Sequence, residues 1–237
     1  MRGEGRRGVA IVTAMGVESL GLARALAAGP WNRRLRRGWH EGLVGNCPTV
    51  LATCGVGLKA ARKWARVLLE EYEPRLVILT GASGGVGPYV DVGDLVVGES
   101  IYWLDERRLV ARFRADAGLL QLASRAATRA PLRPVGGRYP RVLEGGVATT
   151  GRAVGDRQWG EQLAQQHGVL AVEMEGAAIA QACDEQGVPF LTVRAVSDVI
   201  GQRWQWLTMI RNLVRAQRNA ERLVLAIVHL VDAGESC

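Results

Sequence analysis

Histidine and lysine are scarce in this chain, and its cysteines form no metal-binding pattern. Three histidines occur at scattered positions among 237 residues, and the only lysines are Lys59 and Lys63. The four cysteines include no CxxC pair and no histidine at zinc spacing. These absences argue against a metal site and a disulfide framework, so we expect no metal ion and the reduced thiols of a cytoplasmic protein.

The sequence also lacks a long apolar run. No stretch of about 18 uninterrupted apolar residues is present, and the longest run near the end, LVLAIVHLV, has the length of a core helix. The opening residues place arginines before an apolar stretch, as a signal peptide does, but Glu18 interrupts that stretch. A first β-strand explains the pattern equally well, and we expect a cytoplasmic protein without a membrane span.

Arginine supplies nearly all of the positive charge, and the formal net charge is +7. The densest basic cluster is WNRRLRRGWH at residues 31–40, where tryptophans lie among the arginines. Such a cluster fits a contact with nucleic acid or anionic lipid, and it also fits a solvated turn or sheet edge. Because the other basic residues are dispersed, we favour the turn or edge and expect no nucleic-acid partner.

Short β-rich runs alternate with segments of helical periodicity along the chain. Strands are predicted at 8–14, 49–55, 75–85, 94–103, 141–151, 169–174 and 189–198. Helices are predicted at 18–28, 58–72, 115–130, 156–166, 176–186 and 206–232. This alternation is typical of an α/β fold with helices on both faces of a sheet. No linker or internal repeat divides the chain, so residues 1–237 are interpreted as one domain.

Ligands in such folds gather where strands end and helices begin. Met15 and Glu18 follow the first predicted strand, and the third runs into TGASGG. Closely spaced glycines there can turn backbone N–H groups toward one anion or polarised water. Taken singly, Glu18 is an ordinary acid at a helix start and the glycines are an ordinary turn. The glycine segment lacks the GKS or GKT ending of a P-loop, so a nucleoside triphosphate site is not supported.

Two later strand ends carry further charged residues. The stretch AVEMEGAAIAQ places Glu173 and Glu175 among apolar residues, where unpaired carboxylates are costly. The segment VRAVSD contributes Arg194, Ser197 and Asp198. Each acid alone could start or cap a helix. Together, acids at three strand ends with an arginine and a glycine turn favour one pocket equipped for acid–base chemistry.

Several of these segments resemble successive signatures of a known family. They are AIVTAMGVES, CGVGLKAA, LTGASGGVGPYVDVGDLVV and AVEMEGAAIAQACDEQGVPFLTVRAVSD, between about residues 8 and 200. They are similar to the nucleoside phosphorylase and nucleosidase superfamily, and most of all to its 5′-methylthioadenosine/S-adenosylhomocysteine nucleosidase branch. The resemblance implies a three-layer α/β/α fold with a central mixed sheet. It also implies cleavage of an N-ribosidic bond in a small-molecule nucleoside, no cofactor, and a homodimer.

The resemblance assigns roles to individual residues. Asp198 would donate a proton to N7 of the purine, because a purine leaves poorly as an anion. Glu175 would bind the ribose hydroxyls, and Glu18, helped by Arg194, would orient and deprotonate the attacking water, a division of labour like that in glycoside hydrolysis. The other expected substrate-site residues are Met15 and Met174 against the sugar, Ser197 beside the donor, and Glu173, Ser83, Gly84 and Val154.

The sequence departs from the family pattern in two places. Ala82 stands where the family usually has serine or threonine, and Ser83 follows one position later. Val154 stands where an aromatic residue stacks on the purine, and Arg152 replaces a nearby acid. Loss of a stacking ring would weaken base binding by about 1–3 kcal/mol. We therefore expect a base pocket, and with it a substrate, that differ from the family's usual ones.

Three functions stay open at this point. The first is hydrolysis of a purine nucleoside derived from adenosine. The substrate would be a thioether of adenosine, or one of the adenine or hypoxanthine nucleosides that relatives use in menaquinone precursor metabolism and hopanoid assembly. The second is phosphorolysis, and the third is nucleoside binding without catalysis. The first-strand loop TAMGVES carries the acid Glu18 and lacks the arginine by which the phosphorylases bind phosphate. An acid there would repel phosphate, so we favour water as the nucleophile.

Overall fold

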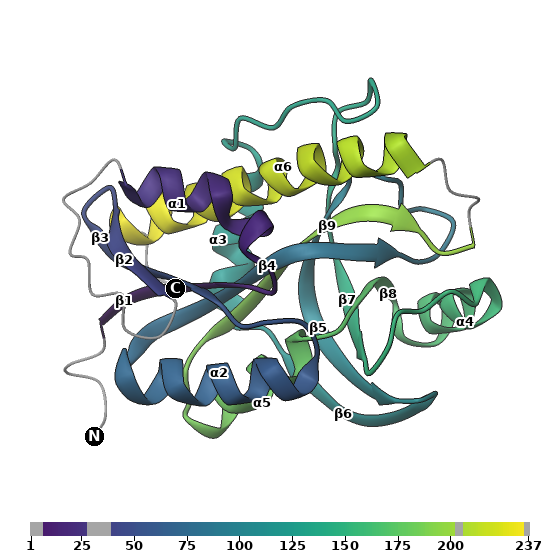
Figure 1. The fold of residues 1–237 in the computed structure, drawn as a ribbon, viewed down its shortest axis with the longest axis horizontal. Coiled ribbons are helices and arrows are strands. Elements are labelled where there is room, and N and C mark those ends of the chain that lie inside the picture. Colours follow the sequence, from purple (N-terminus) through teal and green to yellow (C-terminus); the bar gives the residue numbers. More distant parts are fainter. Residues whose placement is uncertain (1–6, 28–38, 202–205, 235–237) are drawn as a thin grey trace.

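One mixed β-sheet of nine strands organises this computed structural model, which describes residues 7–27, 39–201 and 206–234 (Figure 1). The strands are Arg7–Thr13 (β1), Trp39–Val44 (β2), Cys47–Thr53 (β3), Pro74–Gly85 (β4), Leu95–Asp105 (β5), Arg108–Arg114 (β6), Val142–Thr150 (β7), Val169–Glu173 (β8) and Phe190–Val199 (β9). Their order is β2-β3-β1-β4-β8-β7-β5-β6, and β9 pairs with both β4 and β5. The strands β4, β9, β5, β7 and β8 therefore close into a ring.

The strands run in both directions. The pairs β1–β3, β1–β4, β4–β9, β5–β7 and β7–β8 are parallel, whereas β2–β3, β4–β8, β5–β6 and β5–β9 are antiparallel. Strands β4 and β8 meet over only two residue pairs, at Gly84 and Gly85 of β4. The sheet is thus mixed, as the family resemblance implies.

Helices cover both faces of the sheet (Figure 1). They are Leu20–Ala27 (α1), Leu58–Glu71 (α2), Ala117–Ala127 (α3), Arg157–His167 (α4), Gly176–Glu185 (α5) and Trp206–Asp232 (α6), with a 3₁₀ turn, η1, at Gly16–Ser19. Helices α1, α3 and α6 share one apolar core with the sheet, and α2 and α5 share another on the opposite face. Helix α4 packs beside β8. The predicted three-layer arrangement is confirmed.

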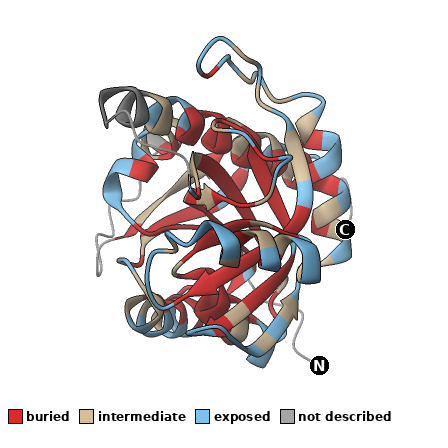
Figure 2. Cartoon of the chain, turned by 90° about the vertical axis from the view of Figure 1, so that its right-hand side faces the viewer, coloured by how far each residue is buried: buried red, intermediate tan, exposed pale blue. Residues whose placement is uncertain are grey.

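The alternation of side chains along each strand explains why the central strands are apolar throughout. In β1, Val9 and Ile11 face the core of α1, α3 and α6, whereas Ala10 and Val12 face the core of α2 and α5. Successive strand residues point to opposite faces, so a strand covered on both faces needs apolar residues at every position. Figure 2 shows the resulting buried centre between helices whose outer faces are exposed.

The structure adds strands β2 and β6, which the sequence did not predict. Residues 31–38 of the basic cluster lie outside the described residues, and Trp39 and His40 begin β2 at one edge of the sheet. Strand β6 forms the other end of the strand order and is largely exposed. Edge strands bury little side-chain surface, so they lack the apolar run that reveals a central strand. The helix predicted at 18–28 is divided into η1 and α1.

The cysteines of the described part of the chain are buried and form no disulfide bond: Cys47, Cys54 and Cys183. Within the same residues, no cluster of three or more histidine, cysteine, aspartate or glutamate side chains could hold a metal ion. No helix there combines the length and apolar character needed to span a bilayer.

Candidate active site

The carboxyl ends of four parallel strands, β1, β3, β4 and β9, lie along one edge of the sheet. In open α/β sheets this edge is where ligands bind. Glu18 follows β1, and Gly57 follows β3. Arg194 lies in the middle of β9, and Asp198 lies near its carboxyl end. Strand β8 contributes Glu173 at its own carboxyl end. Residues far apart in the sequence therefore come together here.

Backbone N–H groups from two strand ends bind the Glu18 carboxylate. Its Oε2 accepts hydrogen bonds from the N–H groups of Ala14 (3.1 Å) and Met15 (2.9 Å), and its Oε1 accepts one from Ala82 on β4 (3.0 Å). The residue is 4% exposed. Hydrogen bonds to an ionised acceptor are stronger than neutral ones. The three donors hold the carboxylate in one orientation at the mouth of the sheet.

Arg194 is the largest fully buried side chain, with 0% exposure. Its Nη2 forms a very short ion pair with Glu173 and lies 3.8 Å from Oε2 of Glu175. Its Nε and Nη1 have no hydrogen-bond partner within the described part of the protein. A buried guanidinium is stable only when paired, so the two glutamates account for its presence. The remaining N–H groups are free to meet a ligand or a water.

Gly81 on β4 brings Arg194 and Glu18 close together. Gly81 is the register partner of Arg194. A Cβ built on Gly81 would lie 2.8 Å from Nη1 of Arg194 and 3.0 Å from Oε1 of Glu18. The two charged groups therefore flank the same point over the strand. Glycine is required there because any side chain would fill the space between them.

Glu173 and Glu175 differ in their surroundings although they are two residues apart. Glu173 accepts hydrogen bonds from the N–H groups of Glu175 (3.0 Å) and Gly176 (2.8 Å) and from the hydroxyl of Thr149. These N–H groups open α5, where the helix dipole favours an anion. With Arg194 as a further partner, Glu173 has its oxygens fully occupied.

Glu175 keeps more of its hydrogen-bonding capacity. Its Oε1 accepts one hydrogen bond, from the N–H of Gly57 (2.7 Å) at the start of α2. Burial raises the pKa of Glu175, with Arg194 opposing the rise and the charges of Glu173 and Glu18 adding to it. The interaction with Glu18 places both carboxylates in one electrostatic environment. Glu175 can therefore accept bonds from hydroxyl groups of a ligand.

Cys54, at the end of β3, belongs to the same environment. Burial, followed by the charge of Glu175, raises the pKa of its thiol to about 12. Its Sγ lies 3.2 Å from the carbonyl oxygen of Gly55. The group is a neutral thiol at physiological pH, which makes it a packing residue and not a nucleophile.

Asp198 lies farther along the same edge. Its register partner is Gly84, three residues beyond Gly81, or about 10 Å along β4 at about 3.3 Å per residue. Burial raises the pKa of Asp198, and a hydrogen bond with Ser197 partly opposes the rise. Ser197 Oγ lies 2.6 Å from Oδ1 of Asp198 and 3.1 Å from the carbonyl oxygen of Ser83.

Burial is what favours a protonated Asp198. Removal from water disfavours the charged carboxylate and raises its pKa, whereas the hydroxyl of Ser197, which donates to Oδ1, lowers it. The effect of burial is the larger of the two. A carboxylic acid with a raised pKa can hold a proton and transfer it to a ligand.

An apolar wall lies beside Asp198. A Cβ on Gly84 would be 3.2 Å from Val172, 3.6 Å from Ile200 and 3.7 Å from Oδ2 of Asp198. Val154 is half-buried and packs against the cluster that contains Val172 and Ile200. This wall is where a flat heterocycle could contact Asp198 without an aromatic residue at position 154.

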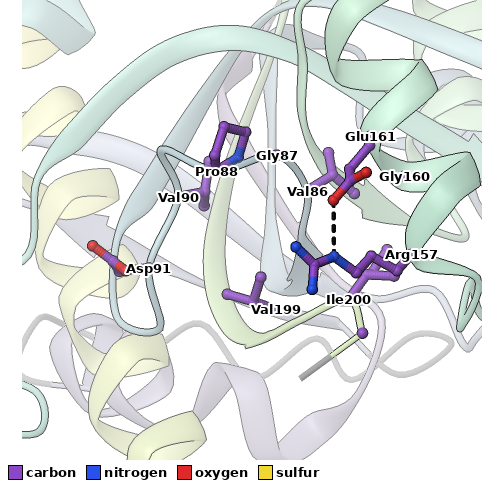
Figure 3. A pocket seen from close by; sticks show the side chains of 11 residues that line it. Val86, Gly87, Pro88, Val90, Asp91, Arg157, Gly160, Glu161, Val199 and Ile200 are labelled. Carbon is purple, nitrogen blue, oxygen red and sulfur yellow. Dashed lines mark hydrogen bonds and ion pairs between the residues drawn. The ribbon is translucent and has the colours of Figure 1, made fainter. Parts of the chain in front are cut away.

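A cavity of about 150 Å³ is lined in part by Ile200, which also belongs to this wall (Figure 3). The β4–β5 loop, α4 and the end of β9 line it, and Arg157 and Glu161 form an ion pair of 2.8 Å at its side. None of the predicted site residues lines it. The cavity is therefore distinct from the edge that carries the carboxylates.

The remaining predicted residues occupy varied positions. Met15 is partly exposed at the mouth of the sheet, and Met174 is half-buried between the two glutamates. The hydroxyl of Ser83 donates within the sheet to the carbonyl of Ala195 (3.4 Å). The structure therefore does not join Ser83 to the group around Glu18, where the N–H of Ala82 is the donor. Arg152 is exposed beyond the end of β7.

Comparison with known proteins identifies the family. The sequence pattern of the Phosphorylase superfamily matches residues 8–229. The chain belongs to this superfamily. A superfamily member from Geobacillus kaustophilus, a 5′-methylthioadenosine/S-adenosylhomocysteine nucleosidase, is 32% identical over 206 residues, covering 81% of this chain and 84% of that protein. The predicted family is confirmed.

Solved structures of superfamily members have the same fold. The 5′-methylthioadenosine/S-adenosylhomocysteine nucleosidase of Neisseria meningitidis, in complex with methylthio-immucillin-A, has a TM-score of 0.78 at 29% identity and covers 93% of this chain and 97% of its own. The nucleosidase of Colwellia psychrerythraea, in complex with adenine, has a TM-score of 0.81 at 24% identity, covering 95% and 96%. At that identity the second comparison speaks for the fold alone.

The structure adds residues to the site that were not predicted as members of it, among them Cys54, Gly57, Gly81 and Thr149. Gly57 has a φ of +91°, which glycine adopts readily, and it presents its N–H to Glu175. The glycine-rich run at the end of β4 was a usable signal for Gly81. Cys54 and Thr149 carry no local signal, because strand residues of these types occur in any sheet.

Proposed function

We propose that this protein hydrolyses the N-ribosidic bond of an adenine nucleoside, with 5′-methylthioadenosine and S-adenosylhomocysteine as the first substrates to test. One observation carries the proposal: Glu18 and Arg194 flank Gly81 of β4, while Asp198 on β9 pairs with Gly84, three residues farther along β4. A water-activating group and a proton donor are thus separated along one strand. A nucleoside laid along β4 would meet them with its sugar and its base, respectively.

Asp198 acts as the acid in this proposal. Its proton moves to N7 of the purine as the bond between N9 and C1′ breaks, so adenine departs as a neutral molecule. The raised pKa of Asp198, which burial causes, supports a protonated starting state. General acid catalysis of this kind contributes about 10²–10⁴-fold to the rate.

Glu18 acts as the base. A water between Glu18 and Arg194 would attack C1′ while Glu18 takes one of its protons. The sugar develops positive charge as the base leaves, and the nearby carboxylates stabilise that charge. Glu175, with one oxygen bound to Gly57, retains acceptor capacity for the ribose hydroxyls. No cofactor enters any of these steps.

The charge around Gly81 favours water over phosphate as the nucleophile. Three carboxylates, from Glu18, Glu173 and Glu175, surround one guanidinium, that of Arg194, which Glu173 already neutralises. A phosphate dianion would meet net negative charge there. The relatives described above are also named as nucleosidases, not phosphorylases.

A nucleoside panel tests the proposal. The protein is incubated with 5′-methylthioadenosine, S-adenosylhomocysteine, adenosine and inosine, with and without phosphate, and released base and sugar are identified by chromatography. We expect adenine and a free reducing sugar from at least one substrate, at a rate independent of phosphate. A sugar 1-phosphate would identify a phosphorylase. Binding without release of base from any nucleoside would identify a binding protein.

We also propose a homodimer. Exposed apolar side chains support it. Leu109 and Val110 on β6, and Val56 in the loop between β3 and α2, are each about half exposed. Exposed apolar side chains of this kind are frequent at interfaces. A second subunit that contacts Val56 would lie beside Gly57, whose N–H binds Glu175, and could help to enclose the sugar end of the substrate.

A further inference from the structure

Helix α6 contributes two buried polar side chains to the segment that carries Glu18. Gln217 and Glu221 are four residues apart and so share one face of the helix; they are 4% and 5% exposed. Gln217 Nε2 donates a hydrogen bond to the carbonyl oxygen of Glu18 (3.0 Å), and Glu221 Oε1 accepts one from the N–H of Gly21 (3.0 Å). Both contacts join residues about 200 positions apart.

Glu221 caps the N-terminus of helix α1. The first turn of α1 contains no acidic residue of its own. The carboxylate of Glu221 accepts hydrogen bonds from Gly21 and Leu22, the second and third residues of that helix. A Cβ on Gly21 would lie 2.0 Å from Oε2 of Glu221, so glycine is needed for this approach. An anion at a helix N-terminus stabilises its orphan N–H groups.

The direction of the Glu18 carboxylate depends on the path of its own main chain. Two of its three hydrogen-bond donors, the N–H groups of Ala14 and Met15, belong to the same short segment. The four-residue turn η1 is too short to hold that path by itself. Gln217 fixes the main chain at Glu18, and Glu221 fixes it three residues later.

We infer that Gln217 and Glu221 are positioning residues for the reaction, acting through Glu18 and not on the substrate. The inference rests on the proposed function, in which Glu18 activates water. Helix α6 is then more than a cover for the sheet, because it sets the geometry of the water-activating group. Asp198 and Glu175 are held by Ser197 and by the N–H of Gly57, so we expect them to keep their positions when the contacts of Gln217 and Glu221 are lost.

Asn219 provides a matched control on the same helix. It is 0% exposed, and its amide exchanges two hydrogen bonds with the main chain of Arg133, at 2.9 and 2.7 Å. Arg133 belongs to the connection between α3 and β7, which carries none of the proposed site residues. Removing the Asn219 amide therefore disturbs α6 without disturbing η1.

The kinetic test compares Gln217→Leu with Asn219→Leu. Oε1 of Gln217 has no partner within the described residues, so leucine also removes an unsatisfied polar atom and the loss of stability is limited. We expect Gln217→Leu to lower kcat by about 10- to 100-fold, as misplacement of a catalytic group does, with KM little changed. Glu221→Gln should do the same more weakly, and Asn219→Leu should leave kcat unchanged.

A double substitution separates positioning from general damage. In a Glu18→Gln background, Gln217→Leu should cause no further loss of kcat, because the group on which it acts is already gone. A further loss of the same factor in that background would overturn the inference. So would an equal fall in kcat for Asn219→Leu.

Hydrogen exchange tests the inference without relying on activity. In Gln217→Leu the amide protons of Ala14, Met15 and Ala82, which bind the Glu18 carboxylate, should exchange faster than in the wild type. In Asn219→Leu they should exchange at the wild-type rate. Unchanged exchange in Gln217→Leu would overturn the positioning role. Inactivity of the wild-type protein would instead overturn the proposed function and leave this measurement valid.

Discussion

The carboxyl group of Asp198 differs from the other acids of the site in having an apolar wall beside it. Because a proton donor is needed only when the leaving group is a poor one, Asp198→Asn should lower adenine release by about 10²–10⁴-fold. The same variant should retain most of its activity on 4-nitrophenyl riboside, whose leaving group departs as an anion. Steady-state kinetics with both substrates check this expectation. Equal losses on the two substrates would contradict the role of Asp198 as acid.

The same group gives the reaction a pH dependence. The active form of Asp198 is protonated, and burial raises its pKa above the ordinary value. Adenine release should therefore decline as pH rises through that raised pKa. Release of nitrophenol should lack this decline. The comparison uses one enzyme in one buffer series, so effects on folding affect both reactions alike.

Gly81 is the residue at which backbone geometry sets the chemistry. In Gly81→Ala the new methyl group would meet Arg194 Nη1 at 2.8 Å and Glu18 Oε1 at 3.0 Å. We expect a fall in kcat/KM of about 10²-fold and a loss of about 1–3 kcal/mol in the free energy of unfolding. Gly155→Ala is the control, because a Cβ there would have nothing within 4 Å. Urea unfolding and kinetics on both variants provide the check, and a fully active Gly81→Ala would contradict the assignment.

At the residue scale, the sequence identified the acids but not their partners. Glu173 and Glu175 are conspicuous because carboxylates are rare among apolar residues. The family resemblance assigned the ribose hydroxyls to Glu175 and gave Glu173 no specific role, whereas the structure pairs Glu173 with Arg194 and leaves Glu175 with free acceptor capacity. Such pairing depends on which strands become neighbours, and a single sequence does not contain that information.

At the scale of elements, Asp94 at the entry to β5 carries a prediction about acid stability. Burial alone would raise the pKa of Asp94, but hydrogen bonds from Arg141 and Arg138 outweigh it and lower the pKa. An acid with a lowered pKa stabilises the fold above its unfolded pKa and loses that contribution as pH falls. Asp94→Asn should cost about 2 kcal/mol at neutral pH, less than a fully buried pair because both guanidinium groups reach solvent.

The pH dependence of that cost is the diagnostic measurement. Denaturant unfolding of wild type and Asp94→Asn should give a difference that shrinks as pH is lowered below about 5. The variant of a neighbouring exposed acid, Asp91→Asn, should change the free energy of unfolding much less. A difference between wild type and Asp94→Asn that is constant with pH would show that Asp94 acts through packing alone.

The central strands and the helices that cover the sheet were predictable from the sequence, and the edge strands were not. The strands β1, β4 and β9 and the helices α2, α5 and α6 carry strong apolar periodicity, and the sequence placed each of them within a few residues. Strand β6 reads Arg-Leu-Val-Ala-Arg-Phe-Arg and is mostly exposed, so it gives no such signal. The pairing of β4 with β8 at Gly84 and Gly85 could not be predicted either. It involves only two residue pairs, too few to produce a periodic pattern of apolar residues in the sequence.

At the scale of the whole molecule, the proposed dimer predicts a mass near twice that of the 25.6 kDa chain. Light scattering coupled to size exclusion would measure it. Val110→Glu, which adds a charge to an exposed apolar position on β6, should shift the mass toward the monomer and raise KM for the nucleoside. Glu144→Lys on β7, also exposed, serves as the charge-changing control. A wild-type protein that stays monomeric at micromolar concentration would contradict the proposal.

The dependence of the site on α6 has a consequence for how the protein is made. Strands β1, β3, β4 and β9 leave the ribosome before the helix that covers one of their faces, and its residues from Ala216 to Val231 fill that core. A nascent chain lacking α6 would expose a large apolar surface. Chaperones bind such surfaces, and chains that expose them without protection aggregate. Such a chain would also carry Glu18 on an unsupported loop. Synthesis must therefore proceed past α6 before any catalytic competence can emerge.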